Sequence, residues 1–560
     1  MQFEWTVILS IGLFCTLVLG NDEVHFKCDE SESNYESQEA FCTVSGFYVT
    51  HSQHVKMMNY TRANMTKFMK FYDSRLLYLP FKLFEHFPNL RTLDVSFTEI
   101  LDITRNTFAS ANSLSYLNMS NNNITTIGTS VFNGANSLIR IDLSRNAIKD
   151  VNEFSFRGLP KVDKIVLSYN KISNLSKDIF VENQYLEVIA LDNNLLGSLD
   201  PEVFSRLRRI REINLSNNQL LSLHPSTFQM AYGIETLLLS GNKLTDFNLE
   251  DKNILLRLHL DGNQLTSLVI NSTKVVRAEN NTISSITALN ANFLEKLVLG
   301  RNNFTDISNI TNITSLLVLD LSYNQIGPLN ITSFEKLRRL KELYLRSTNI
   351  SQISFGMFSK QTALETLDLS FNNLTDLNLN IFFPYMSKIK NFYVDGNNLT
   401  EIHGIHFAYA FPNLVKVGLS KNRFNCSYLH TILSPPFLSG FVELHIEPET
   451  STEESTHIRD ITCTSTKHND GAAPKIQEES EIDVLRNTIN QLKVHEKRLE
   501  LYLLGLKIVM IILSCAGILA IVMIVVKYAK RERRRYSGQF GRNGSIVFRS
   551  NVTMNTSMDH

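Results

Sequence analysis

The sequence contains little of several residue types that define other classes of protein. Its 560 residues include only 12 prolines and 23 glycines, which excludes a collagen-like chain or a disordered chain rich in these two residues. The one tryptophan is Trp5, close to the N-terminus. The formal net charge is zero, because 55 lysines and arginines balance 55 aspartates and glutamates. This balance leaves no global basic field for nucleic acid.

Motifs of known catalytic sites are also missing. The patterns G-x-x-x-x-G-K-[ST], H-E-x-x-H and G-x-S-x-G do not occur. The pairs His51/His54 and His403/His406 have the spacing of metal ligands, but no cysteine or acidic cluster supports them. We interpret them as ordinary loop histidines. We therefore expect no enzyme, no metal site and no cofactor.

The zero net charge conceals an uneven distribution. The last 34 residues carry eight lysines and arginines against Glu532 and Asp559, a net charge of +6. They follow residues 508–526, an uncharged segment long enough to span roughly 30 Å of hydrocarbon as a helix. Basic residues directly after a span favour a cytoplasmic C-terminus. Residues 7–19 are apolar but too short to span, as is typical of a signal peptide. We expect a single-pass type I plasma-membrane protein with an extracellular N-terminus.

Cysteines and glycosylation sequons agree with this topology. Four cysteines lie outside the signal peptide and the span, and in an oxidising compartment they predict two disulfides: Cys28, Cys42, Cys426 and Cys463. N-x-S/T sequons recur before the span, as in a glycoprotein of the secretory pathway. The glycosylation sites that we predict are Asn118, Asn123, Asn174, Asn214, Asn280, Asn303, Asn330, Asn373 and Asn398.

The dominant feature is a repeat of the form L-x-x-L-x-L-x-x-N-x-L. Its fifteen copies begin at Leu90, Leu114, Leu138, Val162, Leu186, Ile210, Ile234, Leu255, Thr273, Leu294, Leu316, Leu340, Leu364, Ile389 and Leu414. Successive starts lie 24 residues apart six times, then 21, 18, 21 and 22, and then 24, 24, 25 and 25. A weaker copy precedes them around Met69, Phe71 and Leu76. The pattern predicts an α/β leucine-rich-repeat solenoid, a horseshoe with a parallel concave sheet.

Each position of the repeat has a physical role. The L-x-L segment alternates as a strand with one buried face requires, and neighbouring repeats share one core. A ladder of asparagines should satisfy buried backbone groups of adjacent turns; it comprises Asn122, Asn146, Asn170, Asn194, Asn218, Asn242, Asn263, Asn281, Asn302, Asn324, Asn372, Asn397 and Asn422. A stack of rings is expected on the convex side, from Phe108, Phe132, Phe156, Phe180, Phe204, Phe228, Phe334, Phe358, Phe382 and Phe407. The four short central repeats lack this ring, so we expect a thinner convex wall and a local change in curvature there.

Both ends of the solenoid need covers, and the cysteines are placed to supply them. Cys28 and Cys42 suit an N-terminal cap, and Cys426 and Cys463 suit a C-terminal cap, where closing the loop would contribute roughly 3–4 kcal/mol. An acidic linker follows. Heptad spacing then predicts a short coiled coil through Ile482, Leu485, Ile489, Leu492, Leu499 and Leu503. A single amphipathic stalk helix is the alternative.

These features divide the chain into seven parts. They are a signal peptide (1–20), an N-terminal cysteine cap (21–65), about 15 to 16 leucine-rich repeats (66–425), a C-terminal cap with an acidic linker (426–475), a coiled-coil stalk (476–507), a transmembrane helix (508–526) and a cytoplasmic tail (527–560).

A solenoid offers its concave strand face for binding. On the C-terminal repeats, the outward positions mix aromatic and charged residues as interfaces do: Asp320, Tyr323, Tyr344, Arg346, Asp368, Phe371 and Tyr393. An aromatic residue before a ladder asparagine is also common filler. Asn118 and Asn214 fall on exposed strand positions and Asn280 lies beside one, whereas no sequon occupies a strand position between 316 and 421. We hypothesise that repeats 11–15 carry the binding surface.

The order of these parts resembles the mosquito leucine-rich-repeat immune protein family in its membrane-anchored form. The similarity includes the shortened run LTDFNLEDKNILLRLHLDGNQLTSLVINSTKVVRAENNTISSITAL and the terminal LSKNRFNCSYLHTIL before the coiled coil. The resemblance implies a role in innate immunity. In soluble members of that family the coiled coil drives heterodimer formation, and the complex carries complement-like thioester proteins to pathogen surfaces. Here the coiled coil is shorter, a span replaces free circulation, and only Cys463 follows Cys426 outside the span.

The sequence thus predicts a type I receptor or co-receptor that binds protein or microbial ligands in innate immunity. The expected partners are a microbial ligand or an extracellular protein, such as a thioester-containing or another leucine-rich-repeat protein. A homo- or heterodimer through the coiled coil is also expected. The alternative is a cell-adhesion or guidance protein that binds a partner on a neighbouring cell or in the matrix.

Overall fold

The computed structural model describes residues 25–26, 28, 40–49, 56–57, 62–80, 82–249, 255–382, 385–435, 437–448, 456–464 and 527. The chain divides into two units, residues 1–466 and 467–560. The predicted signal peptide, coiled-coil stalk, membrane span and nearly all of the tail lie outside the described residues. No helix within the described ranges combines the length and the apolar character that crossing a membrane requires.

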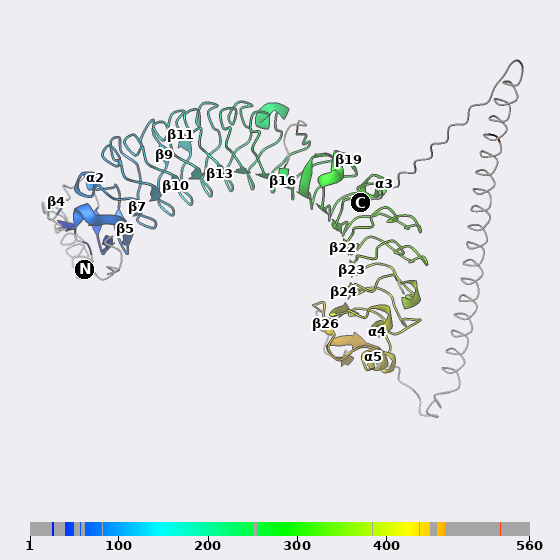
Figure 1. The fold of residues 1–560 in the computed structure, drawn as a ribbon. Helices are drawn as coiled ribbons and strands as arrows, with labels where there is room; N and C mark the ends of the chain where they lie inside the picture. The colour runs from blue at the N-terminus through cyan, green and yellow to red at the C-terminus, as the bar shows by residue number, and fades with distance from the viewer. Residues whose placement is uncertain are drawn as a thin grey trace, which may run out of the picture. The chain divides into compact units, whose positions relative to one another are not determined.

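Short parallel strands form one open ladder along the first unit (Figure 1). In order of pairing they are β2 (Ala40–Ser45), β5 (Thr66–Tyr72), β7 (Thr92–Asp94), β8 (Tyr116–Asn118), β10 (Arg140–Asp142), β12 (Lys164–Val166), β13 (Val188–Ala190), β14 (Glu212–Asn214), β15 (Thr236–Leu238), β16 (Leu255–His259), β18 (Thr273–Arg277), β20 (Lys296–Val298), β21 (Val318–Asp320), β22 (Glu342–Tyr344), β23 (Thr366–Asp368), β24 (Asn391–Tyr393), β25 (Lys416–Gly418) and β26 (Glu443–His445). The predicted leucine-rich-repeat solenoid with a parallel sheet is confirmed.

The sheet extends into both segments that we assigned to caps. Strand β2 lies within residues 21–65 and pairs with β5, the weak repeat copy. Strand β26 lies within residues 426–475 and pairs with β25. Neither strand carries the full repeat pattern, so only the pairing with a neighbouring repeat identifies it.

The asparagine ladder forms as predicted, with two threonines completing it. Asn194 is typical: its Nδ2 donates to the carbonyls of Leu167 (2.9 Å) and Leu191 (3.0 Å), and its Oδ1 accepts from the N–H of Ile172 (3.0 Å). Thr98 and Thr348 occupy the ladder position in the two repeats that lack asparagine. Their hydroxyls donate to a carbonyl of their own turn at 2.7 Å. Buried backbone groups are thereby paired along the solenoid.

The phenylalanine stack also forms, and it begins one ring earlier than predicted. Centroids from Phe84 to Phe228 follow each other at 5.4–6.5 Å. A second stack runs from Phe334 to Phe382. The next ring is Phe411, 5.4 Å from Phe382, whereas Phe407 lies 6.4 Å from Phe392. The prediction that Phe407 continues the stack was therefore wrong. One turn of helix, α4 (Phe407–Ala410), separates the two residues, so that Phe411 and not Phe407 packs next to Phe382.

The short central repeats replace the missing rings with a second pair of strands. β17 (Ser267–Asn271) and β19 (Ser285–Leu289) pair in parallel on the side opposite the main sheet. Leu268 and Ile270 on β17 are buried, so these strands cover the core with smaller side chains than the phenylalanine of the longer repeats. Figure 1 shows the direction of stacking change at these repeats, as we expected from their length.

The remaining elements are small and lie at the ends or on the outer side. Two-residue strands pair as β1 (His25–Phe26) with β4 (Lys56–Met57), β3 (Tyr48–Val49) with β6 (Arg75–Leu76), and β9 (Thr126–Ile127) with β11 (Asp150–Val151). The helices are α2 (Leu83–His86), α3 (Ser308–Thr311), α4 and α5 (Cys426–Ile432), with 3-10 turns at Ala63–Met65, Pro225–Phe228, Ala291–Phe293 and Leu379–Ile381. We predicted an α/β class, but helices make up only a small part of the described residues.

Both predicted disulfides are present. Cys28 bonds to Cys42 on β2, and Cys426 bonds to Cys463. The second bond ties α5 to the antiparallel pair β27 (Thr456–Ile458) and β28 (Ile461–Cys463). These elements cover the last repeats, where Leu429 and Ile461 are buried.

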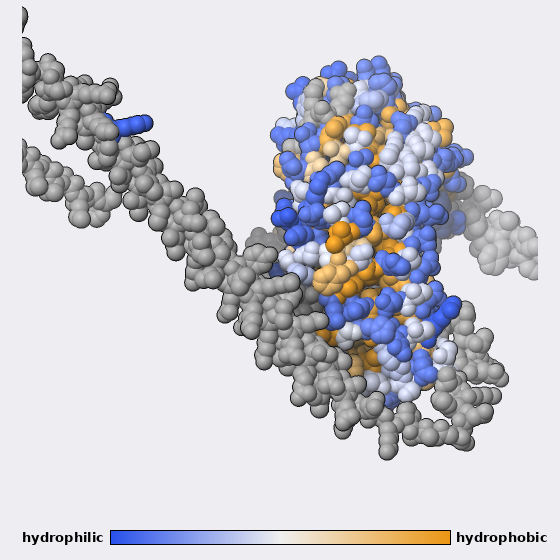
Figure 2. Space-filling view, turned by 90° about the vertical axis from the view of Figure 1, so that its right-hand side faces the viewer, coloured by the Kyte–Doolittle hydropathy of each residue, from blue (hydrophilic) through white to orange (hydrophobic). Residues whose placement is uncertain are grey.

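Seen from the side that lies on the right of Figure 1, the solenoid shows an apolar band between polar margins (Figure 2). That side is the outer face of the C-terminal repeats. Two apolar residues of the C-terminal repeats are largely exposed, Ile331 at 54% and Phe355 at 65%.

Candidate functional site

The predicted binding residues lie on the concave face, where the parallel register aligns them. Asp320, the last residue of β21, pairs with Tyr344 on β22, which pairs with Asp368 on β23, which pairs with Tyr393 on β24. The residue before each of them is fully buried, so alternation along the strand turns these four side chains outward. The four residues therefore form one continuous row.

Two tyrosines of this row are held by neighbouring side chains. The Tyr344 hydroxyl donates to Glu342 Oε2 at 3.0 Å, and burial together with this carboxylate raises the pKa of Tyr344. Tyr393 packs edge-on against His445 with ring centroids 5.1 Å apart, and burial raises its pKa as well. Both phenols are thus neutral hydrogen-bonding groups at physiological pH.

The other three predicted residues meet around a guanidinium. Nε of Arg346 donates to the Tyr323 hydroxyl at 3.0 Å, and its guanidinium lies 4.1 Å from the centre of the Phe371 ring. The Arg301 guanidinium stacks on the ring of Tyr323, 4.2 Å from its centre. Lys421 Nζ lies 5.6 Å from the Phe371 ring. Cations and aromatic rings thus alternate beside the strand row, an arrangement in which each ring face attracts a cation.

One half-buried and one buried carboxylate, Asp368 and Asp395, lie at the strand row. Asp368 accepts a hydrogen bond from the N–H of Ser370 at 2.8 Å, and burial raises its pKa. Asp395 is fully buried and accepts from the N–H (2.8 Å) and the hydroxyl (2.6 Å) of Ser420. Burial raises its pKa too. The row therefore carries negative charge that is partly withdrawn from water.

Sequence reasoning missed three residues that complete this surface. Glu447, which follows β26, binds the Arg346 guanidinium through its carboxylate. His445 Nε2 lies 3.3 Å from the same carboxylate oxygen, Glu447 Oε1. Asp395 joins them from the turn after β24. No repeat position identifies Glu447. The cations could have been predicted, because Arg301 and Lys421 each directly precede a ladder asparagine.

Among the residues that the structure describes, Asp395, His445 and Glu447 could also hold a metal ion. One ligand atom from each lies within 4.8 Å of the others. However, Arg346 already neutralises Glu447, and two donors from Ser420 already satisfy one oxygen of Asp395. A cation would have to enter beside a guanidinium, which opposes it electrostatically.

The structure describes one of the two histidine pairs, His403/His406, and these two side chains contact different partners. His403 Nε2 faces Asp376 Oδ1 at 3.5 Å, whereas the His406 ring packs on Phe437 with centroids 3.8 Å apart. The other pair, His51/His54, lies outside the described residues.

The predicted sequons differ in their surroundings. Asn118 and Asn214 are half-buried at the ends of β8 and β14, and Asn214 Nδ2, the atom that a glycan would occupy, donates to Asp192 Oδ1 at 3.0 Å. Asn398 is half-buried. The remaining predicted sites are exposed, at Asn123, Asn174, Asn280, Asn303, Asn330 and Asn373.

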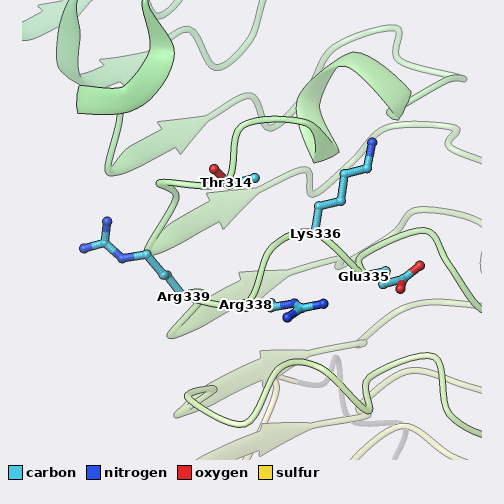
Figure 3. A pocket seen from close by; sticks show the side chains of 5 residues that line it. All are labelled: Thr314, Glu335, Lys336, Arg338 and Arg339. Atoms are coloured by element: carbon cyan, nitrogen blue, oxygen red, sulfur yellow. The ribbon is translucent and has the colours of Figure 1, made fainter. Parts of the chain in front are cut away.

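A shallow pocket of about 550 Å³ lies apart from the row, lined by Thr314, Glu335, Lys336, Arg338 and Arg339. Lys336 Nζ donates to Asn312 Oδ1 at 2.7 Å. Figure 3 shows the Lys336 and Arg339 side chains pointing in different directions. Because the cations diverge, the pocket does not form a site for one anion.

Comparison with known proteins agrees with the geometry. The model of the family described as "Leucine rich repeat" matches residues 120–172, 160–220, 292–350 and 338–385. Those stretches of the solenoid are therefore leucine-rich repeats. Lumican of Gallus gallus is 32% identical over 159 residues, and tubulin-specific chaperone E of Danio rerio is 30% identical over 132 residues. These stretches cover 27% and 23% of this chain, and only 39% and 21% of the lengths of those relatives.

Solved leucine-rich-repeat structures share this fold. The LRIM1/APL1C complex, formed by mosquito proteins, matches with 21% identity and a TM-score of 0.50 over 94% of this chain and 84% of that chain. The Drosophila Toll–Spatzle complex matches with 20% identity and a TM-score of 0.55 over 70% and 58%. At this identity the likeness establishes the fold and nothing finer.

Proposed function

We propose that this leucine-rich-repeat protein is a type I cell-surface receptor or co-receptor that binds a protein ligand on its C-terminal concave face and acts in innate immunity. It works by recognition and not by catalysis. The observation that carries the proposal is the row Asp320–Tyr344–Asp368–Tyr393, aligned by strand register beside a guanidinium flanked by aromatic rings.

The composition of this surface suits a protein partner. Tyrosine and arginine are the residues that most often dominate the energy of protein interfaces, and they do so when neighbours hold them in place. Tyr344, Tyr393 and Arg346 are each fixed by a contact with another side chain. A preordered surface loses less entropy on binding.

Sequon placement supports the choice of this half. Asn118 and Asn214 lie on the concave strands β8 and β14, where glycans would obstruct a partner. The strands from β21 to β25 carry no sequon. This side of the face is therefore the one left open in a glycosylated protein.

The structural neighbours favour an immune setting. The LRIM1/APL1C structure is a complex of two leucine-rich-repeat proteins, and the Toll–Spatzle complex is described as a hub in development and innate immunity. The proposed protein is a membrane-anchored member of that family that forms a homo- or heterodimer. This part of the proposal rests on the family resemblance and on three predicted segments, the signal peptide, the span at 508–526 and the coiled coil at 476–507.

Affinity capture from cells tests the proposal. Tagged full-length protein would be crosslinked at the cell surface, with and without bacterial challenge, and its partners identified by mass spectrometry. Tyr344→Ala and Tyr393→Ala should each reduce recovery of the main partner at least about tenfold. The control is Tyr409→Ala, which changes a 66% exposed tyrosine on α4, away from the row.

Two results would contradict the proposal. Equal recovery by the wild type and both row variants would remove the concave face from the interaction. Recovery of only junctional or matrix proteins, unchanged by challenge, would favour the adhesion alternative.

A further inference from the structure

The chain places one of its own carboxylates on the proposed binding surface. Glu447 Oε1 accepts from Arg346 Nη1, although the two residues are 101 positions apart. Both side chains are shielded, with 12% of Glu447 and 23% of Arg346 exposed. The backbone N–H of Glu447 donates to Ser420 Oγ at 3.1 Å, which holds the segment after β26 against the face.

Two glycines leave room for this arrangement. A Cβ at residue 418 would come within 1.9 Å of Asp395 Oδ2, and one at residue 396, where φ is +62°, within 2.7 Å of the Phe371 ring. Gly396 and Gly418 thus allow Phe371 and Asp395 to lie flat against neighbouring repeats. The Glu447 carboxylate contacts Arg346 and lies within 4.8 Å of ligand atoms of Asp395 and His445.

Two rows of side chains beside Glu447 differ in the sign of their charge. The strand row carries Asp320 and Asp368, which already accept hydrogen bonds from following N–H groups at 2.9 and 2.8 Å. The neighbouring row carries Arg301, Arg346 and Lys421, each over an aromatic ring. Of these two rows, the second offers cations to an incoming anion. Glu447 binds its central cation, Arg346, and Arg301 Nε lies 3.6 Å from Glu279 Oε1.

The planar guanidinium of arginine presents paired donors that match a carboxylate. Arg346 is oriented for this by Tyr323 and Phe371 before any ligand arrives. Glu447 therefore shows which chemistry this part of the face recognises.

We propose that Arg346, with Arg301 and Lys421 on either side along the solenoid, receives an acidic side chain of the protein ligand, and that Glu447 occupies this place until the ligand displaces it. The inference rests on the proposed function, because it names the chemistry of the partner for the same surface. Only molecules with Glu447 released are then competent to bind, so the intramolecular contact lowers the apparent affinity by the fraction released.

A biotinylated oligoglutamate peptide is the probe, with an oligoglutamine peptide as the uncharged control. Binding to the full-length protein in detergent would be measured by biolayer interferometry. Glu447→Ala should bind oligoglutamate roughly 10- to 100-fold tighter than the wild type, the range expected for one charged hydrogen bond. Arg346→Ala should abolish binding in either background.

Glu443→Ala is the matched control. Glu443 lies on β26, is exposed, and pairs with Lys416 at 3.1 Å, whereas Glu447 pairs with Arg346. It should bind the probe as the wild type does. If Glu447→Ala lowers the melting temperature, Glu447→Gln carries the test, because it keeps an acceptor for Arg346 and removes only the charge.

Hydrogen exchange gives an independent readout. Oligoglutamate should accelerate amide exchange in residues 443–448 of the wild type, because displacement frees the segment. The proposal is overturned if Glu447→Ala binds no tighter than Glu443→Ala, or if Arg346→Ala retains binding. These outcomes do not depend on partner capture by the Tyr344 and Tyr393 variants, so failure of this inference is distinguishable from failure of the proposed function.

Discussion

Replacing Asn372 with alanine should destabilise the solenoid more than replacing Asn218, although both changes remove the same atoms from buried ladder positions. The two side chains are 4% and 6% exposed. Asn372 Oδ1 accepts from two backbone N–H groups, those of Thr348 and Ile350, each at 3.0 Å. Asn218 Oδ1 accepts from one, that of Leu196, at 3.0 Å.

The structure allows the cost to be worked out group by group. The carbonyls that Asn372 Nδ2 serves retain other donors, since Thr348 Oγ1 still donates to Leu345 and Asn397 Nδ2 to Leu369. The substitution thus leaves two N–H groups unpaired. Each unpaired buried group costs about 1–3 kcal/mol, so Asn372→Ala should lower the free energy of unfolding by about 2–6 kcal/mol and Asn218→Ala by about 1–3 kcal/mol.

Urea unfolding and amide hydrogen exchange of the full-length protein would measure this. Each repeat contacts only its neighbours, so faster exchange should be confined to the repeats next to the substitution. The amides of Thr348 and Ile350 should lose protection in the first variant, and that of Leu196 in the second. Equal costs, or costs below about 0.5 kcal/mol in both variants, would refute the reasoning and show that water replaces the ladder amide.

Two further predictions follow from packing and charge. Phe358→Ala should lower the free energy of unfolding by about 3–5 kcal/mol, because this ring of the stack is 2% exposed. Phe355→Ala, at a 65% exposed site, should lower it by less than about 0.5 kcal/mol. Similar losses for both variants in urea unfolding would contradict the role of the stack. Burial raises the pKa of Asp395, so its contribution to stability is present below the ordinary value of 3.8 and declines as pH rises. The melting temperature of Asp395→Asn relative to the wild type should therefore increase between about pH 4 and about pH 7. The Arg346 hydrogen bond lowers the pKa of Glu447, so the stability that this carboxylate contributes is present above its ordinary pKa of 4.5 and is lost as pH falls below that value. The melting temperature of Glu447→Gln relative to the wild type should therefore rise as pH falls below about 4.5, and the absence of such a rise would be incompatible with this assignment.

Much of the fold could be predicted because its contacts repeat at a fixed spacing. The core leucines, the ladder asparagines and most of the phenylalanine stack each contact their counterpart one repeat away. Even the residues on the concave row could be named, since strand alternation exposes them. Thr98 and Thr348 were missed because a hydroxyl performs only part of the asparagine role.

The candidate binding surface was predictable only in part. Tyr344 and Tyr393 belong to the repeating strand, and their exposure follows from it. Glu447 and His445 come from a segment without the full repeat pattern, so neither their position on the face nor the contact with Arg346 follows from any spacing. The strands β17 and β19 were also missed, because each pairs only with the other and carries no repeat leucine pattern of its own.

The amino-acid sequence by itself therefore determined the solenoid, its ladder, its stacked rings, its two disulfides and the face that presents aromatic and charged groups. The disulfides follow from the four cysteines outside the signal peptide and the span. The other features depend on interactions between equivalent positions, and a period of about 24 residues is enough to specify them. The tertiary structure alone decided that β2 and β26 extend the sheet, that Phe411 follows Phe382, and that Glu447 reaches Arg346. Those contacts join residues that are not equivalent in the repeat, and only the folded path of the chain brings them together.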